Sequence, residues 1–312
     1  MERKKSILIW CGGIACGILV CLCAWLITHN HGKAGEENAA PPVNHYVNVL
    51  ANPPLPDSLT FCGEPVPLND PMVREALDRE LTSVCYQHST TLLCLKRAGR
   101  YFPVIEQILK EENVPEDIKY LCVTESSLSN AISPAKAVGF WQFLESTAKL
   151  YGLTVNEEVD ERYHVEKSTH AACKYLKEGK KSLGTWSLAA AGYNMGTGGV
   201  NKSKTNQGQS EYWDLYFNPE TARYVFRILA YKLVFEKPHA YNVRLNDKDK
   251  YPPEECEEIE VTSSIPSLYT FCQDNNMTYK ELKILNPWLR STKLTVPAGK
   301  KYIIRKPAKK EK

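Results

Sequence analysis

The sequence has little excess charge of either sign. It carries 39 Lys and Arg against 36 Asp and Glu, which gives a formal net charge of +3. Proteins that bind polyanions usually present a strong basic field, so the composition does not predict nucleic acid as a partner. Hydrophobic residues make up 43% of the chain, which excludes a mostly disordered protein.

The spacings of metal-binding and nucleotide-binding motifs are also missing. None of the seven histidines forms an HExxH pattern, and the cysteines beyond residue 28 contain no CxxC pair. Because both spacings are missing, the sequence predicts no zinc site. The glycine-rich stretch "GTGG" at 196–199 lacks the lysine of a phosphate-binding loop. We therefore expect neither a metal nor a cofactor.

Seven cysteines follow residue 28, an odd number that cannot pair completely within one chain. Cys122 and Cys173 lie in apolar helical patterns and are interpreted as small buried hydrophobes. The sequence leaves the pairing state of all seven open.

The N-terminus carries the longest apolar run. Residues 6–28 read "SILIWCGGIACGILVCLCAWLIT" without a charge, behind Arg3, Lys4 and Lys5. About 20 apolar residues span a bilayer as a helix, so we expect an uncleaved membrane anchor. The preceding basic residues predict a cytoplasmic N-terminus and a body on the opposite side of the membrane. The alternatives are a cleaved signal peptide, whose apolar region is only about 7–15 residues long, and a lipoprotein signal with Cys16 as acceptor.

Composition divides the remaining chain. Residues 29–68 are polar and rich in proline, which favours an extended linker. Helical apolar spacing follows, for example at Phe102, Ile105 and Leu109, and alternating β patterns are scarce up to residue 240. The expected divisions are an anchor at 1–28, a linker at 29–68, a mainly α-helical domain at 69–240, a charged linker at 241–258, a small α+β domain at 259–306 and a basic tail at 307–312.

One acidic residue stands out in "TESSLSNAISPAKAVGFWQF" at 124–143. Pro115 is expected to occupy the first position of an apolar helix that ends near Glu125. A carboxyl group on such a hydrophobic wall has a pKa raised from about 4.3 towards 6–7, which suits a general acid near neutral pH. A surface or capping role is the alternative interpretation.

Four ordered blocks resemble the membrane-bound, D-type family of lytic murein transglycosylases. The resemblance covers roughly residues 70–240 and implies a helical domain with a goose-type lysozyme-like fold, acting on peptidoglycan strands. The blocks are "VTESS" with Glu125 and Ser126, "GFWQF" at 139–143, "AAAGYNMGTGGV" at 189–200 and "ETARYVFRILA" at 220–230.

This resemblance implies a mechanism with a single carboxylate. Glu125 would protonate the glycosidic oxygen between N-acetylmuramic acid and N-acetylglucosamine, and would then take the proton of the C6 hydroxyl as a 1,6-anhydro ring closes. A hydrolytic muramidase, with Asp160 or Glu161 as second carboxylate, and a non-catalytic wall-binding scaffold remain alternatives. "DER" at 160–162 also fits a structural ion-pair network.

The same resemblance implies roles for other residues. Trp141 and Phe140 are expected to pack the core. In three places the sequence departs from the family pattern, with Gly192 for an alanine, Lys136 for a glycine and Phe140 for a leucine. The residues implied to bind substrate are Ser126, Gln142, Tyr193, Asn194 and Tyr224.

The C-terminal unit resembles a LysM peptidoglycan-binding module. The likeness rests on "TYKELKILNPWL" at 278–289 and "LTVPAGKKYII" at 294–304, whereas "SIPSL" at 264–268 replaces the usual start. A purely structural appendage is the alternative. The expected partners are peptidoglycan strands and the membrane, and the sequence identifies no protein partner.

Overall fold

The computed structural model of the protein describes residues 51–308. The predicted membrane anchor, residues 29–50 of the predicted linker and residues 309–312 of the basic tail lie outside this range. Within 51–308, no helix combines the length and the apolar character needed to cross a membrane.

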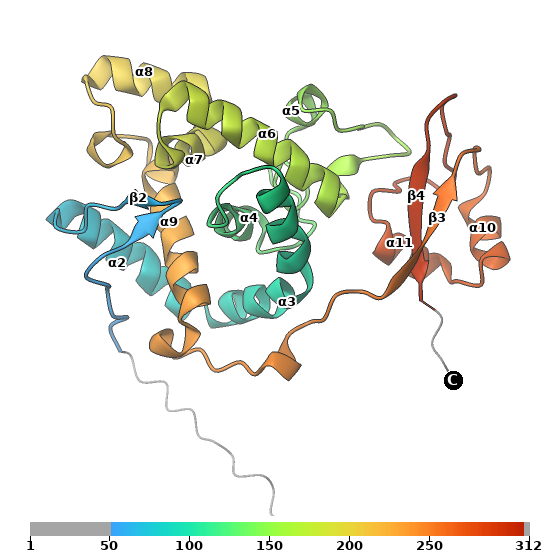
Figure 1. The fold of residues 1–312 in the computed structure, drawn as a ribbon, viewed down its shortest axis with the longest axis horizontal. Coiled ribbons are helices and arrows are strands. Elements are labelled where there is room, and N and C mark those ends of the chain that lie inside the picture. The colour runs from blue at the N-terminus through green and yellow to red at the C-terminus, as the bar shows by residue number, and fades with distance from the viewer. Residues whose placement is uncertain (1–50, 309–312) are drawn as a thin grey trace, which may run out of the picture. The chain divides into compact units, whose positions relative to one another are not determined.

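The first part of the described chain is mainly helical, as the sequence predicts (Figure 1). Its longer helices pack in pairs: α2 against α9, α6 against α7, and α3 against α6. The elements are β1 (Thr60–Phe61), β2 (Glu64–Pro65), α2 (Pro71–Tyr86), α3 (His88–Glu111), α4 (Ile118–Ser126), α5 (Glu145–Leu150), the 3₁₀ helix η2 (Glu161–Tyr163), α6 (Val165–Leu183), α7 (Trp186–Met195), α8 (Thr197–Gln207), η3 (Tyr212–Asp214), α9 (Pro219–Glu236), η4 (Pro238–Tyr241) and η5 (Asp247–Asp249).

Helix α4 lies inside the ring of helices and packs against α3 and α9 (Figure 1). Its first six residues, Ile118 to Val123, are buried, and the apolar residues among them are at most 3% exposed. A helix that is apolar on every side belongs in a core. This position explains how a short helix can hold its C-terminal end in a defined place.

The segment before α2 differs from the predicted linker. Strands β1 and β2 form a small antiparallel hairpin, and Phe61, Val66 and Leu68 are buried in the main core. The packed domain therefore begins earlier than residue 69. Prolines separate these apolar residues in the sequence, so no helical or alternating pattern reveals them.

One helix boundary also differs from the sequence prediction, and helix α3 continues through Pro103. Pro115 is not the first residue of a helix, because α4 begins at Ile118. Instead, the carbonyl of Pro115 accepts a hydrogen bond from the Ile118 amide at 3.1 Å and closes a turn. The prediction for Pro115 was therefore wrong, and the carboxylate of Asp117 in this turn accepts a hydrogen bond from the amide of Cys62 at 2.7 Å.

The C-terminal part combines strands and helices, as expected for a small α+β domain. Strands β3 (Cys256–Val261) and β4 (Tyr302–Pro307) pair antiparallel, and α10 (Leu268–Asp274) and α11 (Tyr279–Leu285) lie between them in the sequence. Thr278 and Glu281 form a capping box at the start of α11.

All seven cysteines of the described chain are free thiols. Cys122 and Cys173 are fully buried in the main core, which confirms their interpretation as small hydrophobes.

Candidate active site

Glu125 occupies the last turn of α4, as the sequence predicts. The chain then turns sharply, because both Ser127 and Leu128 adopt a left-handed backbone conformation with φ values of 53° and 54°. Such conformations are unfavourable for residues other than glycine and are found often at functional sites. Leu128 is fully buried, and Arg97 donates to the Ser127 carbonyl at 3.0 Å, so packing holds the turn that presents Glu125.

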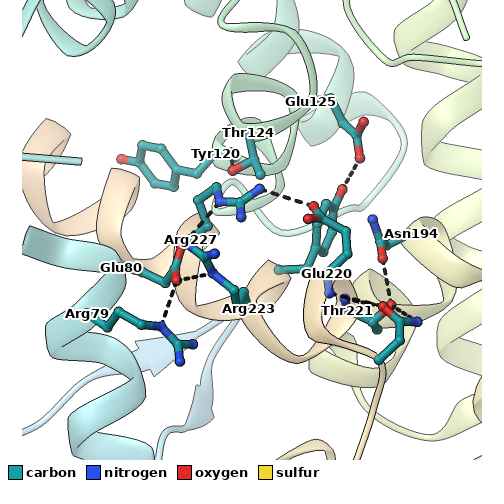
Figure 2. A network of polar contacts seen from close by, with 12 residues as sticks. Arg79, Glu80, Tyr120, Thr124, Glu125, Asn194, Glu220, Thr221, Arg223 and Arg227 are labelled. Carbon is teal, nitrogen blue, oxygen red and sulfur yellow. Dashed lines mark hydrogen bonds and ion pairs between the residues drawn. The ribbon is translucent and has the colours of Figure 1, made fainter. Parts of the chain in front are cut away.

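The hydroxyl of Tyr224, on α9, donates a hydrogen bond to a carboxyl oxygen of Glu125 (Figure 2). Tyr224 is 2% exposed, whereas Glu125 is only half-buried. The role of Tyr224 toward a substrate stays a prediction. One oxygen of the carboxyl group is held from the core side, which leaves the group oriented and still accessible.

The pKa of Glu125 is raised to about 7. Loss of solvation in the apolar surroundings is the main cause, and the negative charge of Glu220 adds to it; the Tyr224 hydrogen bond and the positive charge of Arg227 act in the opposite direction. The C-terminal end of α4, with its partial negative charge, also disfavours an ionised carboxylate. A carboxyl group with this pKa can both give and accept a proton near neutral pH.

Glu220 and Arg227 are charged residues near Glu125 that were not among the predicted site residues. Glu220 and Arg227 flank Tyr224 on α9 at positions i−4 and i+3, so the three share one face of the helix. Arg227 forms an ion pair with Glu220 at 3.2 Å and another with Glu80 at 3.3 Å (Figure 2). Helical spacing from Tyr224 was the signal that could have identified both.

Glu80 anchors this charged face from α2. Its side chain is 1% exposed and forms ion pairs with Arg79, Arg223 and Arg227 (Figure 2). A buried carboxylate needs such partners to remain charged. Glu80 thereby fixes the position of Arg227, and through it the electrostatic surroundings of Glu125.

The "GFWQF" segment forms a tight loop beside the helices. At Gly139, φ is +84°, and an added Cβ would lie 2.0 Å from the carbonyl oxygen of Arg162. Only glycine fits this contact. Trp141 and Phe140 are buried, as predicted, and the Trp141 ring nitrogen donates to the Thr169 hydroxyl at 2.8 Å.

Gln142 and Tyr193 both stabilise this loop. The Gln142 amide nitrogen donates to the carbonyls of Ala131 and Gly139 at 3.0 and 2.8 Å. The hydroxyl of Tyr193, on α7, donates to the Trp141 carbonyl at 2.7 Å. Burial, followed by the negative charge of Glu125, raises the pKa of Tyr193 well above its ordinary value.

Asn194 and Ser126 make local contacts. The Asn194 side-chain oxygen accepts a hydrogen bond from the Thr221 hydroxyl at 2.7 Å and joins the end of α7 to the start of α9 (Figure 2). The Ser126 hydroxyl donates to the Cys122 carbonyl at 3.3 Å and is buried. These contacts position the elements around Glu125, and the roles of both residues toward a substrate stay predictions.

Asp160 and Glu161 are engaged in ion pairs. Asp160 binds Arg162 at 2.7 Å, and Glu161 binds Lys167 and accepts the Thr154 amide at 2.7 Å. Both carboxylates are buried, which agrees with the ion-pair interpretation of the sequence.

Lys136, which departs from the family pattern, has a φ of 62°. This is the backbone conformation that favours glycine, so the lysine adopts the conformation that a glycine would adopt with less strain.

Two surface pockets have linings that do not include Glu125. One, of about 570 Å³, is lined by Glu64, Asp70, Trp213 and their neighbours, and none of the predicted site residues borders it. The other, of about 380 Å³, lies on the C-terminal domain between Ser267, Tyr269 and Tyr279. Within residues 51–308 there is no group of three or more His, Cys, Asp or Glu side chains suited to a metal ion.

Comparisons with known proteins agree with the α-helical fold around Glu125. Residues 102–216 match the family model of the transglycosylase SLT domain, and residues 257–310 match that of the soluble lytic transglycosylase C-terminal LysM-like domain. The chain is therefore similar to an SLT domain over residues 102–216 and to a LysM-like domain over residues 257–310.

Two curated relatives are each 35% identical to this chain over 191 residues, or 59% of its length. Both are membrane-bound lytic murein transglycosylases D, one from Escherichia coli K12 and one from Escherichia coli O6:H1. The matched region spans 41% of the length of each relative.

Proposed function

We propose that this protein is a peptidoglycan lytic transglycosylase and that Glu125 is its only catalytic carboxylate. The observation that carries the proposal is the state of Glu125, a half-buried group with a pKa of about 7 that is oriented by the Tyr224 hydroxyl. The SLT match and the likeness to murein transglycosylases supply the substrate class.

The first step uses the protonated form of Glu125. The carboxyl group donates its proton to the oxygen between N-acetylmuramic acid and N-acetylglucosamine, and the bond from that oxygen to C1 breaks. The carbonyl oxygen of the muramyl N-acetyl group bonds to C1 and stabilises the developing positive charge. Substrate assistance of this kind replaces the second carboxylate of ordinary glycosidases.

The second step uses the ionised form. The Glu125 carboxylate takes the proton of the C6 hydroxyl on the same sugar, and O6 attacks C1 while the bond to the N-acetyl oxygen opens. Glu125 ends protonated, a 1,6-anhydro ring has formed and no water is consumed. Both reacting groups belong to one sugar ring, so proximity favours ring closure over attack by water.

The direct test is digestion of purified peptidoglycan with the wild-type protein and with Glu125→Gln. The amide keeps the shape of the side chain and still accepts the Tyr224 hydrogen bond, but it cannot transfer a proton. Loss of general acid and base catalysis costs about 10²–10⁴-fold in rate. A variant that retains more than a tenth of wild-type turnover would remove Glu125 from the mechanism.

A hydrolytic muramidase is the second candidate, and one observation favours it. The charge of Glu220 acts on Glu125, so a second carboxylate is present in its surroundings. Against this role, Glu220 is paired with Arg227. Reducing ends in the digest would identify the hydrolase. A protein that binds strands without releasing either product would instead be a scaffold.

We also propose that residues 6–28 anchor the protein in the membrane of the bacterial envelope, with the SLT domain on the periplasmic side. The apolar run and the membrane-bound relatives support this proposal. Deletion of residues 1–28 should move the protein from the membrane fraction to the soluble fraction and leave turnover intact. Retention in the membrane would contradict the anchor, and loss of turnover in a folded protein would show that the segment does more than anchor.

A further inference from the structure

The C-terminal domain makes backbone hydrogen bonds to the SLT domain. The Asp160 amide donates to the Trp288 carbonyl at 2.9 Å, and the Arg290 amide donates to the Glu158 carbonyl at 2.8 Å. Val159 lies between them and forms an antiparallel bridge with Leu289. Residues 158–160 therefore pair with residues 288–290 of the C-terminal domain in a short antiparallel contact.

Charged side chains reinforce this contact. The Glu158 carboxylate accepts the Thr295 amide at 2.6 Å and forms an ion pair with Lys293 at 3.1 Å. The Arg290 guanidinium stacks over the Tyr163 ring at 4.2 Å from its centre. Close to these residues, Arg305 of β4 forms an ion pair with Glu166 of α6.

An apolar cluster joins the C-terminal domain to the loop that contains "GFWQF". Val138, immediately before Gly139, is 4% exposed and is buried together with Val159 and residues of the C-terminal domain, among them Trp288 and Leu289. Val138 also forms bridges with Ile132 and Phe143, on either side of it in the loop. The loop at 131–143 thus has one side chain in the core of the other domain.

A polar path leads to the same loop. Asp160, whose amide binds the Trp288 carbonyl, holds the guanidinium of Arg162 at 2.7 Å. Arg162 then donates to the carbonyls of Lys136 and Phe143 at 3.3 and 3.2 Å. Arg162 is 8% exposed. Its carbonyl also forms the close contact that only Gly139 tolerates.

We propose that the C-terminal domain positions the active-site loop at 131–143, through residues 158–163 and Val138, so that its docking sets the turnover rate. The inference rests on the proposed function. The loop carries Gln142 and Trp141, and the Trp141 carbonyl accepts a hydrogen bond from Tyr193, a residue that the charge of Glu125 reaches. A domain that served only to add affinity for glycan would need none of these contacts with the loop.

The experiment uses the full chain and separates docking from folding. Glu158→Ala combined with Arg290→Ala removes polar contacts and leaves both apolar cores unchanged. Val159→Asp is an independent second variant that places a charge in the shared cluster. Glu158→Gln, which keeps a side-chain acceptor for the Thr295 amide, is the conservative rescue, and Glu260→Ala is the matched control because its ion pair with Lys301 lies within the C-terminal domain.

Amide exchange at Asp160 and Arg290 reports docking, and amide exchange at Val138 and Gly139 reports the state of the loop. Tm reports folding, and kcat and KM are measured on soluble glycan strands. In the undocked variants we expect faster exchange at both places and a kcat lower by about 10–100-fold, since small misplacements of catalytic geometry have effects of that size. KM should stay within about twofold of wild type, because the change acts on geometry. Glu158→Gln and Glu260→Ala should resemble wild type.

Three results would overturn the inference. Undocking with unchanged loop exchange and unchanged kcat would show that the loop holds itself. A change confined to KM would make the domain a tethered binding module. Amides at Asp160 and Arg290 that stay protected in every variant would show that the named contacts do not dock the domain. Absence of turnover in the wild-type protein refutes the proposed function instead, and loop exchange then still tests the structural part.

Discussion

The hydroxyl of Tyr224 binds the carboxyl group of Glu125 across the interface between α9 and α4. This contact joins two residues 99 positions apart in the sequence. It lowers the pKa of Glu125, whereas burial raises it by more, and the result is a pKa of about 7. The same tyrosine thus orients the carboxyl group and limits how strongly the surroundings favour its protonated form.

The first prediction concerns the pH dependence of catalysis. The free protein must hold Glu125 protonated to act as an acid, and this form is lost as pH rises through about 7. We expect kcat/KM to fall tenfold per pH unit on the alkaline side, with a midpoint near pH 7. Initial rates on soluble strands between pH 5 and 9 test this. A profile without a descending limb in that interval would contradict the role of Glu125 as acid.

The second prediction uses two variants that shift this midpoint in opposite directions. Tyr224→Phe removes the hydrogen bond that lowers the pKa of Glu125, so the limb should move to higher pH. Glu220→Gln removes a negative charge that raises this pKa, so the limb should move to lower pH. Shifts of a few tenths of a unit up to about one unit are expected for single interactions of this kind. Shifts of the same sign in both variants would contradict the electrostatic description.

The third prediction concerns stability. Because the pKa of Glu125 is higher in the folded state than its ordinary value of 4.5, the folded protein binds the proton more tightly, and stability falls as pH rises from 4.5 to 7. Glu125→Gln lacks this penalty. We expect the variant to be more stable than wild type by about 3 kcal/mol at pH 8, with the difference shrinking toward pH 4. Urea unfolding at both pH values measures it, and a variant less stable at pH 8 would refute it.

The fourth prediction compares two glycines of similar backbone conformation. Gly139 and Gly152 have φ values of +84° and +88°, but an added Cβ meets the Arg162 carbonyl at 2.0 Å only at Gly139. Gly152→Ala should lose about 1 kcal/mol from backbone strain alone. Gly139→Ala should lose at least about 2 kcal/mol more, since the backbone must move. Equal losses in thermal unfolding would show that the contact with Arg162 can relax.

Much of the site could be predicted from the sequence because its chemistry is local. An apolar helix that ends in a glutamate predicts burial and a raised pKa, and both are found at Glu125. The helical pattern around Tyr224 predicts its buried position. These inferences need only the periodicity of one element at a time.

The parts that sequence reasoning missed depend on contacts between distant segments. Phe61 is buried, and the amide of the neighbouring Cys62 donates a hydrogen bond to the carboxylate of Asp117, 55 positions away. The link from Trp288 to Asp160 crosses between domains. Neither pairing has a periodic signal, because each is made by one side chain or one carbonyl group.

The last prediction concerns the product, which depends on whether any second carboxylate activates water. Asp160 and Glu161 are held in buried ion pairs, so neither is free to act as a base. Glu220 remains as the rival, since its charge acts on Glu125. We expect Glu220→Gln to retain at least about a tenth of wild-type turnover at its own pH optimum, because removing a true second carboxylate would cost about 10²–10⁴-fold. The muropeptides should end in 1,6-anhydro-N-acetylmuramic acid in both proteins, lighter by one water than hydrolytic products, as mass spectrometry can show. Reducing ends in the wild-type digest, together with a dead Glu220→Gln variant, would instead assign a two-carboxylate muramidase mechanism.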